Sequence, residues 1–367
     1  MMAGQVLFER VSLRNFRNLS EVEFEPAPRV NVISGDNGQG KTSLLEALYF
    51  VATTRSFRTE NLRELVQQGQ EQSVVRARIA EAPLAREQRV VLTGGRRTAL
   101  VDGKAPPSLS SYATRTPVVA FHPGHLQLVS GPSALRRTLL DRLALFIDPP
   151  SAEARARYTR ALKERQRVLE ERGTTAVELE AYETIAADQG ARLSVARERA
   201  AGRLGAALLP IFEQMASPEL ELGVRYVPGG ATEPERFREE LLRRRPTDQR
   251  RKRATFGPQR DELELSLEGR LARQHASQGQ QRILTLALKA AELSCIEQAR
   301  DAHPVLLLDD VSSELDPGRT GAVYEFLRRS KSQVFVTTTR PELFVTPLAD
   351  AADRADFSVA RGVLARQ

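Results

Sequence analysis

The segment from Gly35 to Thr42 carries the clearest chemistry, because it fits the phosphate-binding pattern G-x-x-x-x-G-K-T. A strand-like apolar run, Val30–Ile33, precedes it, and a helical pattern of apolar residues follows. Glycines let backbone N–H groups turn toward phosphate oxygens, and the helix start adds partial positive charge. In this motif the lysine reaches the β- and γ-phosphates, and the threonine hydroxyl holds Mg²⁺. We therefore expect ATP and Mg²⁺ to bind at Gly35, Asp36, Asn37, Gly38, Gln39, Gly40, Lys41 and Thr42.

A second cluster with chemical potential follows an apolar run that ends at Leu308. Asp309 is expected to orient Mg²⁺ through water, and Asp310 to lie beside the γ-phosphate as the general base. Another apolar strand, from Gln333, ends in a run of threonines at Thr337. Since ligands of an α/β sheet bind at the carboxyl ends of its strands, we predict that both strand ends converge on Lys41. Lys41, Asp309 and Asp310 are the predicted catalytic residues.

A third motif opens a predicted helix over residues 282–299. Ser277 is placed to cap that helix, which leaves its hydroxyl and the following N–H groups at a positive helix end. A long helical segment separates this motif from Lys41 in the sequence, as in ATPase heads of the ABC class that are split by an insertion. In such heads the motif completes the nucleotide site of a second subunit. We therefore expect an ATP-dependent homodimer in which Ser277, Gly279 and Gln280 contact the partner's nucleotide.

The composition favours a polyanionic partner. The chain has 367 residues, 54 basic and 47 acidic side chains, a net charge of +7 and a pI near 9.8. A single cysteine, Cys295, excludes a disulfide framework, and no apolar run is long enough to span a membrane. We expect a cytoplasmic protein associated with the nucleoid. The densest basic run is either a DNA phosphate contact or a solvated loop, and it comprises Arg243, Arg244, Arg245, Arg250, Arg251, Lys252 and Arg253.

The order of the elements predicts an α/β fold in which an ABC-type ATPase head is split by a helical arm. The head is expected over residues 1–128 and 217–367, with a mixed sheet and a β-rich subdomain. The arm is expected over residues 129–216. Strands are predicted at 6–16, 22–24, 74–79 and 89–92, with a hairpin turn at 102–103. Two antiparallel arm helices are predicted at 151–172 and 177–209, with a further strand at 219–226 returning to the head.

Three short loops allow two interpretations each. Arg14 or Arg17 lies near nucleotide or DNA, or belongs to a strand end and turn. Arg55 and Arg58 face a nucleotide, or belong to a solvated turn. The two histidines near residue 122 suggest a metal, although structural or solvated roles fit them better.

At these motifs the chain resembles the RecF family of bacterial recombination mediators over nearly its whole length. The similar blocks are Leu13–Asn18, Gly35–Thr42, Arg55–Arg58, Gly131–Asp141, Thr255–Asp261, Ser277–Arg282 and Leu308–Asp316. The chain departs from the family pattern at 121–126, where acidic residues usually follow the proline. The resemblance implies a DNA-dependent ATPase that dimerises with ATP and binds duplex DNA beside single-stranded gaps. It further implies RecO- and RecR-like partners that help load RecA.

Three other classes compete with this interpretation. An ABC transporter ATPase has its signature motif much nearer the phosphate loop. An SMC- or Rad50-like tether needs a far longer coiled coil. The third class is a scaffold that binds ATP and DNA but hardly hydrolyses ATP. This alternative stays open because Asp310 stands where the wider class has glutamate. The shorter side chain predicts slow hydrolysis.

Overall fold

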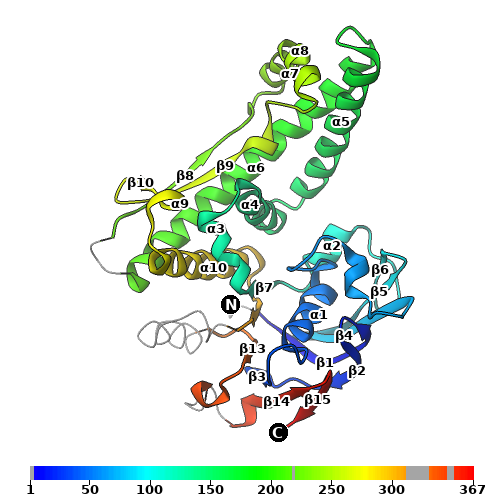
Figure 1. Ribbon diagram of the computed structural model, residues 1–367, viewed down its shortest axis with the longest axis vertical. Coiled ribbons are helices and arrows are strands. Elements are labelled where there is room, and N and C mark those ends of the chain that lie inside the picture. Colours follow the sequence, from blue (N-terminus) through cyan, green and yellow to red (C-terminus); the bar gives the residue numbers. More distant parts are fainter. Residues whose placement is uncertain (1–3, 217–219, 311–329, 345–350) are drawn as a thin grey trace. The chain divides into compact units, whose positions relative to one another are not determined.

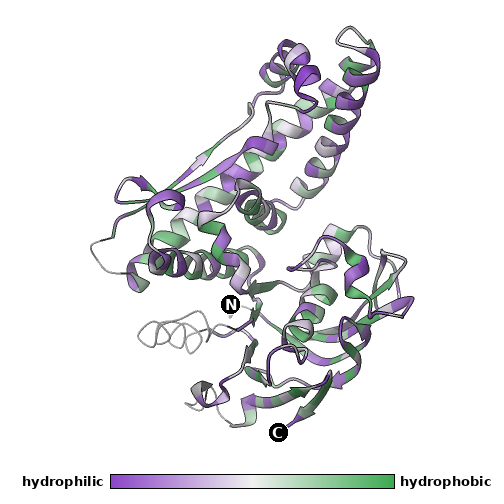
Figure 2. Ribbon diagram, viewed as in Figure 1, coloured by the Kyte–Doolittle hydropathy of each residue, from purple (hydrophilic) through white to green (hydrophobic). Residues whose placement is uncertain are grey.

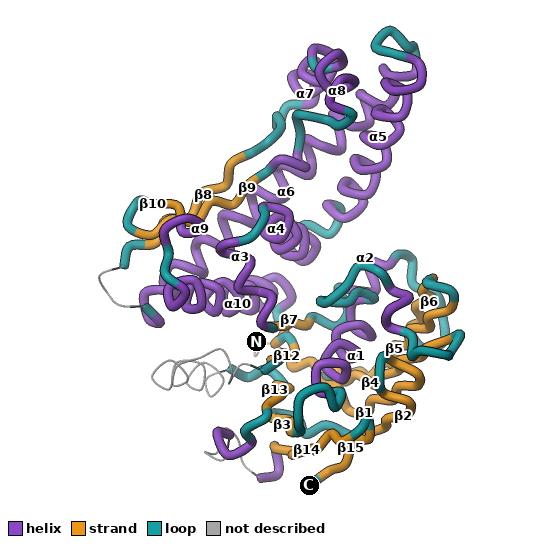
Figure 3. The backbone as a smooth tube through the Cα atoms, viewed as in Figure 1, coloured by secondary structure: helices purple, strands orange, loops and turns teal. Residues whose placement is uncertain are grey.

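The structure is a computed structural model that describes residues 4–216, 220–310, 330–344 and 351–367. The chain forms two compact units. Unit 1 comprises residues 1–125 and 296–367, and unit 2 comprises residues 126–295. Figure 1 traces the chain, and Figure 3 shows that most strands belong to unit 1 and most long helices to unit 2. The predicted motif residues Ser313–Asp316 lie outside the described part of the chain.

A largely parallel sheet in unit 1 carries the phosphate-binding loop. Its six described strands are β3 (Val30–Ser34), β7 (Val118–Phe121), β12 (Val305–Leu308), β13 (Val334–Thr338), β14 (Arg354–Ala360) and β15 (Val363–Arg366). Their order is β15-β14-β3-β13-β12-β7, and only β15 is antiparallel. Strand β13 therefore separates the strand before the phosphate loop from the strand before Asp309. All three strands end at the same edge of the sheet, as predicted.

The second sheet of unit 1 forms the predicted β-rich subdomain. Its strands are β1 (Gly4–Phe16), β2 (Leu19–Phe24), β4 (Gln72–Glu81), β5 (Leu84–Thr93), β6 (Arg96–Val101) and β11 (Ala302–His303). The pairs are antiparallel except that β1 and β11 run parallel. The strands predicted at 6–16, 22–24, 74–79 and 89–92 each lie within one of these elements. The predicted turn at 102–103 is closed by a bridge between Val101 and Lys104.

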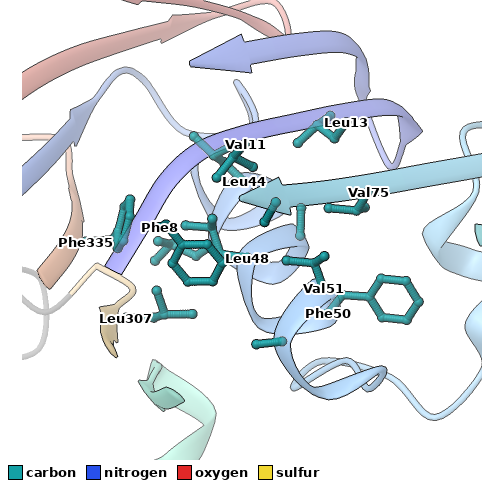
Figure 4. Close-up of a cluster of buried hydrophobic side chains, with 14 of the residues drawn as sticks. Phe8, Val11, Leu13, Leu44, Leu48, Phe50, Val51, Val75, Leu307 and Phe335 are labelled. Carbon is teal, nitrogen blue, oxygen red and sulfur yellow. The ribbon is translucent and has the colours of Figure 1, made fainter. Parts of the chain in front are cut away.

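Helix α1 (Lys41–Thr53) packs between the two sheets of unit 1. Figure 4 shows Leu44, Leu48 and Val51 of α1 meeting side chains of β1 and β4, including Val11 and Val75. Each such buried aliphatic side chain contributes about 1.5–3 kcal/mol relative to an exposed one. The burial extends beyond the apolar face that the sequence predicts. Among the polar side chains of α1, Lys41, Ser43 and Glu46 are buried as well.

Unit 2 is built around long helices. Its helices are α3 (Gln127–Ser130), α4 (Ser133–Ile147), α5 (Ser151–Arg172), α6 (Glu178–Met215), α7 (Pro234–Arg243), α8 (Arg245–Arg251), α9 (Ala272–His275) and most of α10 (Gln278–Arg300). Helix α5 has the predicted bounds, and α6 continues through Pro210 beyond the predicted end. The two helices pack on each other and are joined by a turn at Gly173, whose φ is 83°. Figure 2 shows that α5 is mostly hydrophilic, as expected for a solvated arm.

The predicted end of the arm, at residue 216, is not where unit 2 ends. Unit 2 continues to residue 295 and includes β8 (Leu222–Val227), which was expected to return to the head. Strand β8 instead pairs antiparallel with β9 (Glu262–Leu267), and β9 pairs with β10 (Arg270–Leu271). The alternating pattern of β8 therefore predicted the strand correctly. It could not specify the pairing partner, because register and partner depend on residues far away in the chain.

Candidate nucleotide site

The phosphate-binding loop has the backbone that its sequence predicts. Gly35, Gly38 and Gly40 have φ values of 148°, 80° and 121°, a range that other residues rarely adopt. A Cβ at Gly35 would lie 2.3 Å from the backbone oxygen of Val359 on β14. The loop thus needs glycine both for its conformation and for its close approach to the neighbouring strand. It leads directly into α1, so the N–H groups at the helix start face the loop.

The Lys41 side chain curls back over this loop. Its Nζ donates to the backbone oxygens of Gly35 at 2.6 Å and Asp36 at 2.9 Å. Burial lowers the pKa of Lys41, and the negative charges of Asp310, Asp309 and Asp36 oppose that shift. The ammonium is therefore held at the mouth of the loop among carboxylates, where a polyphosphate would find a compact positive charge.

Strand ends from opposite halves of the chain meet at Asp309. Its Oδ1 accepts hydrogen bonds from the hydroxyls of Thr42 and Thr337, each at 2.9 Å. Burial raises the pKa of the Asp309 carboxyl, and the hydrogen bonds from Thr337 and Thr42 oppose the shift. The predicted convergence of the two strand ends on the phosphate loop is confirmed.

Asp310 follows in an unusual backbone conformation, with a φ of 48°. Its N–H donates to the Thr337 hydroxyl at 2.9 Å, so one threonine binds both neighbouring aspartates. Aspartate and asparagine tolerate this left-handed conformation better than most side chains do. The conformation therefore offers a physical reason for aspartate at this position.

Two sets of contacts that brace the phosphate-binding loop were not predicted. The Asn18 amide donates to the Gly38 oxygen at 3.2 Å, and its oxygen accepts from the Ser43 hydroxyl at 2.8 Å. Gln39 accepts from the N–H groups of Arg361 and Gly362, in the turn between β14 and β15, at 2.6 Å and 3.1 Å. Asn18 lies inside the quoted 13–18 block, so that motif contained the signal. Nothing in the sequence near residue 361 indicated this contact.

A cavity of about 580 Å³ opens over the loop. Arg17 and Arg58 line this cavity, whereas Arg14 and Arg55, which were considered with them, do not. Arg14 forms an exposed ion pair with Glu21 on the antiparallel sheet. Gly35, Asp36 and Gln39 belong to the phosphate-binding loop but are not among the residues that line the cavity. The lining residues are Arg17, Asn18, Asn37, Gly38, Gly40, Lys41, Thr42, Ser43, Arg58, Glu64, Val66, Gln68, Asp309 and Asp310.

In unit 2, Ser277 precedes α10 and makes a reciprocal cap with Gln280. The Ser277 Oγ accepts from the Gln280 N–H at 3.2 Å, and the Ser277 N–H donates to the Gln280 side chain at 2.8 Å. Ser277 is exposed, and Gly279 and Gln280 are half-buried. The capping role predicted for Ser277 is confirmed, and its hydroxyl lies at a surface helix start.

Comparison with known proteins identifies the family. The model of the RecF/RecN/SMC N-terminal domain matches residues 7–105. The DNA replication and repair protein RecF of Myxococcus xanthus is 39% identical over 349 residues, which cover 92% of each chain. RecF of Anaeromyxobacter sp. is 38% identical over 96% of this chain and 97% of its own. The chain belongs to the RecF family.

Solved structures agree with this assignment. The structure of the recombination mediator protein RecF with ATP matches with a TM-score of 0.88 at 27% identity, over 99% of this chain and 98% of that one. A second structure, RecF-ATPrS, has the same TM-score at 25% identity and covers both chains fully. An SMC head bound to a winged-helix domain of ScpA matches at a TM-score of 0.55 and 15% identity, over 98% of this chain and 96% of that one, which supports the fold alone. The predicted fold class, an ABC-type ATPase head with an inserted unit, is confirmed.

Charged residues in and beside the blocks at 131–141 and 255–261 form largely buried ion pairs in unit 2. Arg197 of α6 donates to both carboxylate oxygens of Asp141, at 2.7 and 3.0 Å, and to Asp261 at 2.9 Å. Arg136 makes a bidentate pair with Glu262 at 2.7 and 2.9 Å. Since unpaired charges are costly to bury, these residues fix how α4, α6 and β9 pack. The sequence blocks around residues 131–141 and 255–261 are explained here by structure within unit 2.

The basic run divides into two parts. Arg245 is mostly buried and forms a bidentate pair with Glu183 at 2.9 and 2.6 Å. Arg243 and Arg244 both bind Glu240, and Arg244 also lies over the Phe256 ring. By contrast, the exposed side chains at 250–253 have no ion-pair partner among the described residues. Arg243, Arg244 and Arg245 thus have partners within unit 2, whereas Arg250, Arg251, Lys252 and Arg253 are exposed without one among the described residues; the DNA contact of this run stays a prediction.

His122 and His125 take part in an aromatic stack. The His122 ring stacks on Phe57 with centroids 5.0 Å apart and lies 3.8 Å from the His125 ring. Within the described ranges, no three His, Cys, Asp or Glu side chains are grouped to hold a metal ion. Of the two interpretations, the geometry favours the structural one. In the described part of the chain, no helix is long and apolar enough to cross a membrane.

Proposed function

We propose that this member of the RecF family is an ATP-dependent recombination mediator in DNA repair and replication. The observation that carries this proposal is the meeting of Lys41, Thr42 and Asp309 at one cavity over a complete phosphate loop. The relatives support the proposal, since the similar sequences are named DNA replication and repair protein RecF. The two similar RecF structures are named as complexes with ATP and ATPrS.

The site fits a magnesium nucleotide. Mg²⁺ is usually held by one or two carboxylates, a hydroxyl and the substrate's phosphates, with several waters. Thr42 Oγ1 and Asp309 Oδ1 are hard oxygen donors 2.9 Å apart, at the place that such a cation would occupy. When bound, Mg²⁺ would neutralise phosphate charge and polarise the transferred phosphoryl group. The chain's own part is to hold the phosphates with loop N–H groups and Lys41, and to offer Asp310 as the base for a water.

The nucleotide would also govern assembly. Ser277, Gly279 and Gln280 present a capped helix start at the surface of unit 2, and helix starts bind phosphate. We place this motif on the nucleotide of a second copy, which gives an ATP-dependent homodimer. The exposed basic residues 250–253 would contact duplex DNA at gaps. We further propose RecO- and RecR-like partners and help in RecA loading, a proposal that membership of the RecF family supports.

The decisive test is steady-state ATP hydrolysis measured with no DNA, blunt duplex, single strand and gapped duplex. We expect slow basal turnover that rises most with gapped duplex. The Lys41→Met variant should lose ATP binding, whereas Lys163→Met, an exposed lysine on α5, serves as the matched control. If the folded parent binds no ATP, the proposed function is wrong. If it binds ATP and gapped DNA with no turnover, the protein is an ATP-switched scaffold instead.

A further inference from the structure

We propose that Glu46 is a positioning residue for the nucleotide site. It binds both arginines of the cavity, holding Arg17 firmly and Arg58 loosely. Glu46 lies in the second turn of α1, and its side chain is fully buried. It neither lines the cavity nor belongs to the phosphate-binding motif. The inference rests on the proposed function, since it assigns this carboxylate a role in ATP turnover.

The Glu46 carboxylate joins α1 to two other segments of the chain. Arg17, from the turn between β1 and β2, donates to both Glu46 oxygens at 2.9 and 2.8 Å. The Ser56 hydroxyl donates to Oε1, and Arg58 donates to Oε2 at 3.4 Å. The Ser56 hydroxyl also accepts from the N–H groups of Arg58 and Thr59 at 2.9 and 3.0 Å. Glu46 therefore fixes the backbone of the Arg58 loop as well as the two guanidinium groups.

The two arginines are held to different degrees. Arg17 uses a bidentate fork, the strongest geometry for a guanidinium and a carboxylate, and its side chain is only 17% exposed. Arg58 makes one long contact with Glu46, and its side chain is 43% exposed. We infer that Arg17 is a fixed wall of the cavity and that Arg58 is tethered yet able to turn toward a phosphate.

Charge explains why a carboxylate, and not a neutral acceptor, suits this place. Two guanidinium groups beside Lys41 would repel one another and would bind any polyanion strongly. Glu46 neutralises one positive charge and holds both guanidinium groups at the wall of the cavity. The positive charge of Arg58 still reaches the catalytic edge, where it opposes the raised pKa of Asp309. Glu46 thus lowers the affinity for nucleotide and in return fixes the positions of the two arginines.

The test is Glu46→Gln in the full chain, with fluorescent ATP and ADP titrations beside steady-state hydrolysis. Glutamine keeps the shape but removes the charge and one acceptor. We expect nucleotide binding tighter by roughly two- to tenfold, since a unit negative charge near the phosphates is lost. Turnover at saturation should fall by roughly 10- to 100-fold, since the arginines lose their geometry. A purely structural role would instead weaken binding together with stability.

The matched control is Glu60→Gln, the same change at an exposed residue of the same loop that lies outside the cavity lining. A second variant, Arg17→Lys, keeps the charge and loses the fork; we expect parent-like affinity with reduced turnover. Parent values for Glu46→Gln, or weaker binding at parent turnover, would overturn the inference while leaving the proposed function intact. Should Glu46→Gln fail to fold, parent turnover by Arg17→Lys overturns it. A parent that binds no ATP overturns both proposals.

Discussion

The Thr42 hydroxyl donates to Asp309 Oδ1 at 2.9 Å, and this contact joins the phosphate-loop half of unit 1 to its C-terminal half. Thr42 lies at the start of α1, after the loop that follows β3, and Asp309 directly follows β12; strand β13 separates β3 from β12 in the sheet. Thr337, at the end of β13, completes the link by donating to the same carboxylate oxygen. If Mg²⁺ binds here, Thr42 and Asp309 would hold it with oxygens that the fold already keeps in place, so little reorganisation would be needed for binding.

Asp309→Asn should separate stability from function. Burial raises the pKa of Asp309, so the native state holds this proton more tightly than the unfolded chain does. The raised pKa stabilises the folded protein only while the carboxyl is protonated. Its contribution to the free energy of unfolding is complete below the unfolded pKa of about 4, and it is lost as the pH rises through the raised pKa of the folded state. We expect the nucleotide-free variant to unfold at or above the parent temperature at pH 8, by up to a few degrees.

This advantage should shrink as the pH falls toward about 4 and disappear well below it, where aspartate is protonated in both states. Differential scanning calorimetry at several pH values, without nucleotide or Mg²⁺, measures it. The same variant should lose Mg²⁺-dependent ATP hydrolysis. A clearly lower unfolding temperature at pH 8 would mean that the hydrogen bonds from Thr42 and Thr337 outweigh the burial cost.

Removal of three basic side chains should lower the salt dependence of duplex binding. Arg250, Arg251 and Arg253 are exposed and lack ion pairs among the described residues. Each lost phosphate contact should reduce the log–log salt slope by about 0.9, so the triple alanine variant should lose up to about 2.7. Fluorescence anisotropy between low and moderate salt measures the slope.

The control for this experiment removes the same charge elsewhere. Arg10, Arg14 and Arg78 are exposed but already paired with Glu23, Glu21 and Glu9. Their triple alanine variant should change the slope less than the variant at 250–253 does. Equal slopes for both variants would assign the 250–253 segment to solvent.

Much of the fold followed from local patterns, and the failures came from long-range contacts. The bounds of α5 and the glycines at 35, 38 and 40 were predictable because periodicity and turn chemistry are local. The pairing of β8 with β9 was not, because its sequence only fixes an alternating surface. Arg245 looked like its basic neighbours, yet it is buried against Glu183, which lies on another helix. Glu46 looked like an ordinary helix residue until its buried partners were known.

Ser277→Arg should abolish ATP-induced dimers while leaving ATP binding unchanged. The Ser277 hydroxyl and the N–H groups after it lie at an exposed helix start in unit 2, and Lys41 belongs to unit 1. Arginine removes the cap, which typically costs about 1 kcal/mol, and places bulk where a phosphate would bind. Light scattering with and without ATP measures the dimer, and fluorescent ATP measures binding. Normal dimers from this variant would exclude Ser277 from the interface.

Asp310→Asn should retain ATP binding and dimerisation and lose hydrolysis. Asparagine adopts the left-handed backbone of residue 310 as readily as aspartate does, so the N–H donated to Thr337 should persist. What changes is the basic carboxylate that could accept a proton from the attacking water. Aspartate is one methylene shorter than the glutamate of the wider class, and a misplacement of about 1 Å can lower the rate on the order of 100-fold.

We therefore expect slow turnover by the parent and a further loss of about 10²- to 10⁴-fold in the Asp310→Asn variant. Single-turnover hydrolysis with radiolabelled ATP measures both rates, and light scattering confirms the dimer. Hydrolysis by Asp310→Asn at the parent rate would show that Asp310 is not the base, and slow turnover would then need another cause.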